Sequence, residues 1–206
     1  MNENWAAQNL QTIRTLMERS AIYRRALAPI TLLTGVVGLV AGGVGWMTQC
    51  DSPRRFICFW FAVAVAALAG SFVVIRRQAL REKESFWSPP TRRVTQAMLP
   101  SLYIGLIAGL VLAFVVEDAD VTWALVPVWM ALYGSALHAA GFFMPRGIKL
   151  LGWLFIIGGT LLLLGLVAQP EPPEFQFIHV VMGTAFGGLH LAYGIYLHFT
   201  EKKTAS

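Results

Sequence analysis

FIHVVMGTAFGGLHLAYGIYLHF, residues 177–199, contains no Asp, Glu, Lys or Arg and is long enough to cross a lipid bilayer as one helix. It carries His190 near its middle. A side chain that can ionise is costly inside hydrocarbon, so this residue is a candidate for function. Steps of three and four residues place it on one helical stripe with Gly183, Gly187 and Gly194. The stretch therefore predicts a transmembrane helix with one face made of glycine and a single imidazole.

An earlier apolar segment repeats this arrangement. At helical spacing, His138 shares a stripe with Ala131, Gly134, Ser135 and Gly141. We therefore expect two transmembrane helices that each present an imidazole among small residues.

The composition of the whole chain indicates an integral membrane protein. The chain has 206 residues, of which 56% are hydrophobic and 13% are charged, and its mean hydropathy is +0.61. A soluble globular domain is far less apolar. At roughly 20 residues per crossing, the length allows about six transmembrane helices and no separate soluble domain. The sequence predicts an all-α, polytopic fold with crossings at residues 27–48, 54–75, 98–116, 121–143, 149–168 and 177–199.

Residues 1–26 predict an amphipathic helix in the membrane interface. Apolar side chains that include Trp5, Leu10, Ile13 and Met17 fall on one side of this helix, with polar side chains opposite. The segment has no apolar core close to its start, so it is not a cleavable signal peptide. Residues 200–206 are expected to form a short tail.

The distribution of basic residues predicts the orientation. Arg54 and Arg55 fall on one side of the expected membrane, and the other 14 of the 16 Lys and Arg residues fall on the opposite side. By the positive-inside rule, both termini and residues 200–206 are cytoplasmic, in a bacterial-type inner membrane. This topology accounts for the net charge of +5 without a nucleic-acid partner.

The longest polar segment between crossings covers residues 76–93. It combines basic side chains with Phe86, Trp87 and an expected break at Pro89 and Pro90. One interpretation is a loop that lies along an anionic membrane leaflet. The other is a docking site for a cytoplasmic or membrane-protein partner.

Several classes of chemistry lack the residues that they need. The expected crossings contain Asp, Glu, Lys and Arg only at their ends, which disfavours an ion-coupled transporter. The chain has no metalloprotease helix motif, nucleophile elbow, phosphate-binding glycine loop or Cys-x-x-Cys pair, so we expect neither a catalytic residue nor a metal site. Cys50 and Cys58 flank a loop whose compartment permits a disulfide, but Cys58 falls inside an expected helix.

Three hypotheses account for His138 and His190, and one of them is a role in proton transfer or metal binding. The two histidines could also be axial ligands of a b-type haem, with flanking glycines that leave room for the macrocycle. The hypothesis that we prefer is structural: small residues let two helices approach closely, and a neutral imidazole hydrogen-bonds across the contact for about 1 kcal/mol. His179 and His198 are expected at the two membrane interfaces. The candidate cofactor-binding residues are His138, His190, Gly134, Gly141, Gly187 and Gly194.

The preferred function is therefore a non-enzymatic one. We expect a subunit of a membrane complex, or a sensor that binds a partner through the N-terminal helix and residues 76–93. One alternative is electron transfer through haem b. Another is a small facilitator or channel whose passage is lined by Thr31, Thr34, Ser71, Ser135, Thr160 and Thr184.

Overall fold

The computed structural model describes residues 27–48, 50–81, 87, 89–116, 118–144 and 146–204. The amphipathic helix expected at residues 1–26 lies outside the described residues. The described elements are all helical, which confirms the all-helical, membrane-like class. They are the helix Leu27–Thr48, α2 (Pro53–Arg81), α3 (Pro89–Val111), η1 (Leu112–Val116), α4 (Ala119–Thr122), α5 (Leu125–Ala140), α6 (Arg146–Val167), α7 (Phe175–Met182), η2 (Gly183–Gly188) and α8 (Leu189–Thr204).

Five of the described helical stretches are long and apolar enough to span a membrane. They are Leu27–Thr48, Pro53–Arg81, Thr91–Val116, Gly147–Val167 and Phe175–Thr200. The crossing expected at residues 121–143 corresponds to the shorter α5, of 16 residues, which a turn at residues 123–124 separates from α4.

Two helices extend beyond the crossings that the sequence predicts. The second crossing was expected to end at residue 75, but α2 continues to Arg81. The third was expected to begin at residue 98, but α3 begins at Pro89. Proline is tolerated in a first helical turn because its missing N–H has no partner there in any case, so the two prolines start this helix instead of breaking the chain.

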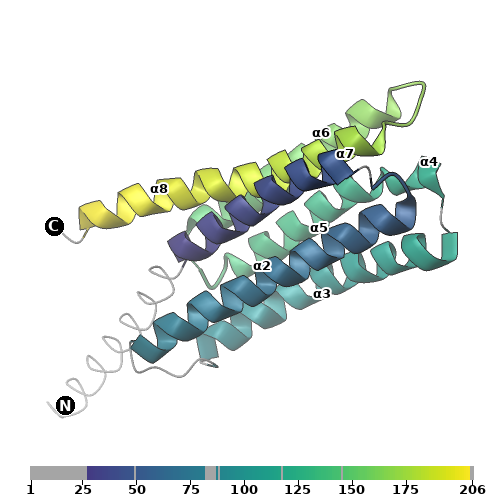
Figure 1. Ribbon diagram of the computed structural model, residues 1–206. Coiled ribbons are helices and arrows are strands. Elements are labelled where there is room, and N and C mark those ends of the chain that lie inside the picture. The colour runs from purple at the N-terminus through teal and green to yellow at the C-terminus, as the bar shows by residue number, and fades with distance from the viewer. Residues whose placement is uncertain are drawn as a thin grey trace, which may run out of the picture.

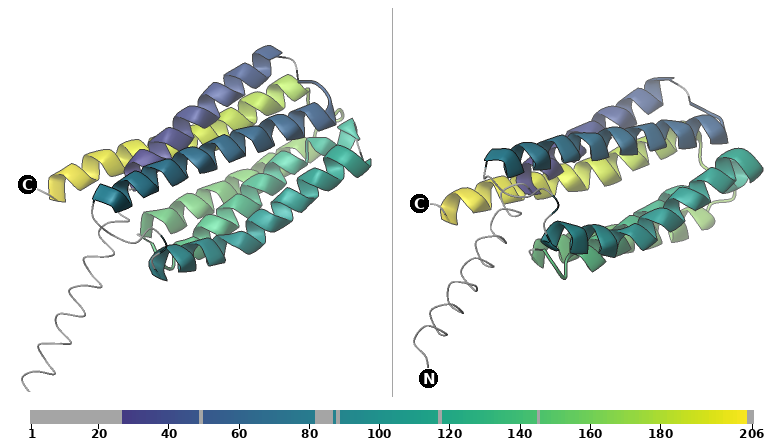
Figure 2. Two further views of the ribbon diagram at one scale, coloured as in Figure 1. Left: turned by 60° about the horizontal axis from the view of Figure 1, so that its bottom comes forward. Right: turned by 90° about the horizontal axis from the view of Figure 1, so that it is seen from below.

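The helices form two layers. The helix Leu27–Thr48, α2 and the α7–η2–α8 stretch make the first layer, and α3, α5 and α6 make the second (Figure 2). Leu27 and the end of α8 lie at the same end of the bundle, which we call the terminal end (Figure 1). The opposite end is called the loop end.

One hydrogen bond shows how α2 lies against the second layer. Arg54, in the first turn of α2, donates from Nε to the carbonyl oxygen of Ala113 in η1, at 3.3 Å. Its guanidinium also lies 5.1 Å from the centroid of the Phe114 ring. The start of α2 therefore meets the end of the α3–η1 stretch at the loop end, so α2 and α3 are antiparallel and Arg81 and Pro89 lie toward the terminal end.

Glycines bring the helix Leu27–Thr48 close to the C-terminal helix. A Cβ on Gly38 would lie 2.8 Å from Cα of Gly187, and a Cβ on Gly42 would lie 2.7 Å from Cα of Gly183. Real Cβ atoms essentially never approach other atoms so closely, so these backbones pack directly on each other, as small residues allow in membrane helices. We call these four residues the glycine seam.

The outer surface of the bundle is apolar. In the spanning part of α2, only 11% of the residues are buried. Val65, Leu68 and Phe72 are among its exposed side chains. Such a surface favours hydrocarbon over water, as expected for a membrane-embedded bundle.

Candidate functional site

His190 lies in the first turn of α8 and is 4% exposed. Its Nδ1 is 2.6 Å from the carbonyl oxygen of Phe186, and its Nε2 is 2.7 Å from the hydroxyl oxygen of Tyr133. A carbonyl oxygen can only accept, so Nδ1 carries a hydrogen and donates it. In the neutral ring Nε2 then accepts from the Tyr133 hydroxyl. Both ring nitrogens of His190 are therefore satisfied.

The hydrogen bond between Tyr133 and His190 joins the two layers. Tyr133 belongs to α5, in the second layer, and His190 to α8, in the first. Phe155 of α6 packs against both rings, with its centroid 5.1 Å from that of Tyr133 and 5.5 Å from that of His190. Phe186 also lies 5.1 Å from Phe155, so the hydrogen bond is enclosed by aromatic rings.

A π-helical turn changes the stripe that the sequence predicts around His190. Gly183 and Gly187 face the helix Leu27–Thr48, as described above, but the next residue on this face is Leu191. A Cβ on Gly35 would lie 2.7 Å from Cα of Leu191. The wider π turn at Gly183–Gly188 rotates the residues after it around the axis, so His190 leaves the glycine face and points to the second layer.

His138 lies in α5, apart from the contacts of His190. Its ring meets Trp153 at 5.5 Å and Phe142 at 5.7 Å, both edge to face. Its buried Nδ1 has no hydrogen-bond partner among the residues described. Within the described ranges, no hydrogen bond or ring contact joins His138 to His190.

Neighbouring helices cover the four glycines that flank the two histidines in the sequence. The nearest atoms to a Cβ on each glycine belong to another segment of the chain: Gly152 for Gly134, Lys149 for Gly141, Leu39 and Gly38 for Gly187, and Leu32 for Gly194. For Gly134, the backbone oxygen of Gly152 would be only 2.5 Å away. These glycines serve close helix packing, and the space beside each of them is filled by protein.

His179 is the buried histidine that sequence reasoning missed. It was expected in the interface, but its exposed fraction is 0%. Trp60 of α2 donates from Nε1 to Nδ1 of His179 at 3.1 Å, so the neutral ring carries its hydrogen on Nε2. This Nε2 has no hydrogen-bond partner in the described part of the chain. The depth of His179 along its helix predicted access to water, but α2 and the helix Leu27–Thr48 cover the ring.

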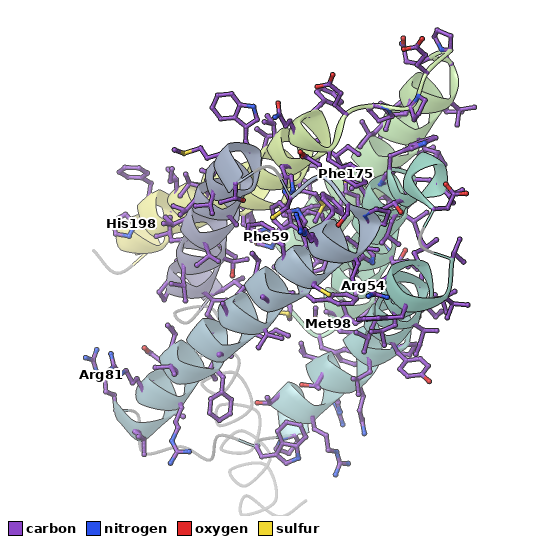
Figure 3. All side chains as sticks on the ribbon, turned by 45° about the vertical axis from the view of Figure 1, so that its right-hand side comes forward. Arg54, Phe59, Arg81, Met98, Phe175 and His198 are labelled. Atoms are coloured by element: carbon purple, nitrogen blue, oxygen red, sulfur yellow. The ribbon has the colours of Figure 1, made fainter. Side chains whose placement is uncertain are left out.

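Aromatic rings surround His179 where three helices meet. Phe56, Phe59 and Trp60 of α2 have ring centroids 4.8, 5.4 and 6.0 Å from that of the imidazole. Phe175 of α7 lies at this junction with α2, with its ring centroid 5.6 Å from that of Phe56 (Figure 3). Gly45 completes the enclosure, because its missing side chain makes room for the ring. We call Gly45, Phe56, Phe59 and Trp60 the His179 box.

The described residues offer little for metal binding or for a polar passage. Among them, no group of three or more His, Cys, Asp or Glu residues could hold a metal ion. Cys50 and Cys58 are both free. Ser135, Thr160 and Thr184 are exposed, and each donates to the carbonyl oxygen four residues earlier in its own helix. Their hydroxyl groups therefore do not line a common interior path.

No family model matches the chain, and no curated protein or solved structure matches it either. The interpretation of the two buried histidines therefore depends on their own geometry. That geometry includes two imidazole hydrogen bonds between helices, one within the first layer and one between the layers.

Proposed function

We propose that this chain is a non-enzymatic subunit or sensor of a membrane complex that works by binding a partner. The observation that carries this proposal is the state of His190: its Nε2 accepts from Tyr133 of another helix, and its Nδ1 donates to Phe186 in its own helical stretch. A ligand could bind His190 only by displacing one of these two hydrogen bonds. This arrangement supports a structural role for His190, the most conspicuous polar group of the apolar interior.

We also propose six crossings, with α4 and α5 together forming the fourth. The common position of Leu27 and the end of α8 at the terminal end supports this count, because a chain returns to its starting side only after an even number of crossings (Figure 1). Five long helices therefore require a sixth. The neighbouring α4 and α5 cover residues 119–140 almost without interruption, which is sufficient for a crossing.

The terminal end is proposed to face the cytoplasm of a bacterial-type inner membrane. Arg54 and Arg55 begin α2 at the loop end. The basic residues at the end of α2 and the start of α3 lie at the terminal end instead. This asymmetry supports cytoplasmic termini by the positive-inside rule.

The partner is proposed to bind at the terminal end, through residues 1–26 and the segment 76–93. Residue 27, to which the N-terminal segment is joined, lies at that end. To test this, the tagged full chain would be crosslinked in native membranes and purified. We expect specific co-purified proteins, which Leu10→Ser with Ile13→Ser should remove and the polar-face control Gln11→Ser should retain. Recovery of the chain alone, from membranes in which other complexes survive, would contradict the proposal.

Haem binding stays an alternative that can be tested directly. Iron ligation would require His190 to exchange the Tyr133 hydrogen bond for the metal. A Soret band in protein from haem-supplied cells, lost in both His138→Ala and His190→Ala, would establish haem, and its absence would exclude it. The facilitator alternative is tested with reconstituted vesicles, whose impermeability to small solutes would remove it.

A further inference from the structure

We propose that five arginines at the terminal ends of α2 and α3 bind the phosphate headgroups of anionic phospholipids. They are Arg76, Arg77, Arg81, Arg92 and Arg93, which we call the arginine cluster. This inference assigns the arginines of segment 76–93 to lipid and leaves residues 1–26 to the proposed partner, and it requires only that the terminal end lies at a membrane surface.

The antiparallel arrangement of α2 and α3 gathers the cluster at one end. The hydrogen bond from Arg54 to Ala113 fixes the start of α2 beside η1. The last turns of α2 and the first turns of α3 therefore share the opposite end, as the course of the two helices shows (Figure 1). The side chain of Arg81 extends outward there (Figure 3).

The five guanidinium groups are available to a ligand. All five residues are exposed. In the part of the chain that the structure describes, none of them makes a side-chain hydrogen bond, an ion pair or a ring contact, whereas Arg54 at the loop end does. Residues 76–93 contain six basic side chains and two acidic ones, Glu82 and Glu84, which leaves an excess of four positive charges.

The surroundings favour a lipid over a soluble acidic protein. Leu80, between Arg77 and Arg81, is 69% exposed, and Trp87 is 55% exposed. Exposed apolar side chains among cations suit the boundary between headgroups and acyl chains, where tryptophan is also enriched. A guanidinium group donates two parallel hydrogen bonds to a phosphate, so arginine suits this ligand better than lysine does.

The test measures lipid retention by the full chain in detergent, using native mass spectrometry with phosphatidylglycerol and phosphatidylcholine. We expect the wild type to retain phosphatidylglycerol about tenfold better than phosphatidylcholine, because basic residues near a membrane surface attract anionic headgroups. Changing all five arginines to Gln should remove the preference. Changing all five to Lys should leave an intermediate preference, and the loop-end control Arg55→Gln should behave as the wild type.

Two further measurements keep the result interpretable. A membrane-impermeant maleimide on Cys50, added to proteoliposomes, reports whether the Gln variant keeps the wild-type orientation. Inorganic phosphate at millimolar concentration should not displace the lipid, because the acyl chains of the lipid strengthen its binding and free phosphate lacks them. An unchanged preference in the correctly oriented Gln variant would overturn the proposal, as would displacement by free phosphate or retention of an acidic protein in place of lipid.

Discussion

The imidazole of His179 lies directly against Gly45, on the neighbouring helix Leu27–Thr48. A Cβ on Gly45 would lie 2.7 Å from Cγ of the imidazole ring, closer than real Cβ atoms come. This contact explains how a ring of this size can be fully buried where three helices meet. A methyl group added at Gly45 would therefore test how tightly the His179 box is packed.

Gly45→Ala is therefore expected to destabilise the bundle by about 1–3 kcal/mol, the usual cost of overpacking. Gly43 is the matched control, because a Cβ there meets nothing within 4 Å. Gly43→Ala should be neutral or slightly stabilising, since alanine is the better helix former. Thermal unfolding in detergent, followed by tryptophan fluorescence, measures both. Equal effects of the two variants would contradict the packing described for His179.

The glycine seam allows a second comparison between adjacent residues. Gly187→Ala would place a methyl group 2.8 Å from the carbonyl carbon of Gly38, whereas Gly188→Ala meets nothing within 4 Å. We expect only the first change to weaken the contact between the N-terminal and C-terminal helices, by about 1–3 kcal/mol. Thermal unfolding in detergent checks this, and a stable Gly187→Ala protein would show that the two helices are further apart.

Trp60→Phe removes the donor for Nδ1 of His179 and leaves a buried acceptor unsatisfied. We expect a loss of about 1–3 kcal/mol, with a much smaller loss when His179→Phe is added, because removing both partners of a hydrogen bond can be nearly neutral. A double-mutant cycle in thermal or denaturant unfolding measures the coupling. Trp46→Phe serves as the control, since that residue is 55% exposed. Additive effects of the two changes would show that the hydrogen bond is not formed.

Tyr133→Phe tests the link between the layers. It removes the hydroxyl that donates to His190 and should cost about 1 kcal/mol, a typical hydrogen bond between membrane helices. Tyr196→Phe is the matched control, because Tyr196 is 60% exposed. Hydrogen exchange would compare α5 and α8 in the two variants. We expect faster exchange in these helices only in Tyr133→Phe, and identical exchange would assign the link to other contacts.

Much of the fold could be predicted from composition and periodicity. The all-helical membrane class and the approximate position of every apolar helix follow from runs of apolar residues, because a bilayer imposes length and polarity on each crossing. The glycines of the sixth apolar stretch also indicated a close helix contact, which the seam with Gly38 and Gly42 provides. The ends of α2 and α3 were less predictable, since cationic and proline-containing turns are compatible with either helix or loop.

The candidate site was less accessible to sequence reasoning. The spacing of residues in the sequence placed His190 on the glycine stripe. A π-helical turn rotates it toward Tyr133 instead, and the α-helical periodicity of the sequence does not indicate such a turn. His179 was expected in the interface because its depth along the helix suggested water. Its burial depends on α2, which is distant in the sequence.

The sequence by itself determined that this chain is a set of apolar helices, with its basic residues concentrated in a few segments outside their apolar parts. These properties belong to each segment separately, because they arise from transfer between water and hydrocarbon. Only the tertiary structure decided which helices are neighbours, and hence that His190 meets Tyr133 and that His179 meets Trp60 and Gly45. Lipid solvates every apolar helix face about equally well, so it does not decide which helices become neighbours. That choice depends on close packing and hydrogen bonds between helices, which a single segment does not specify.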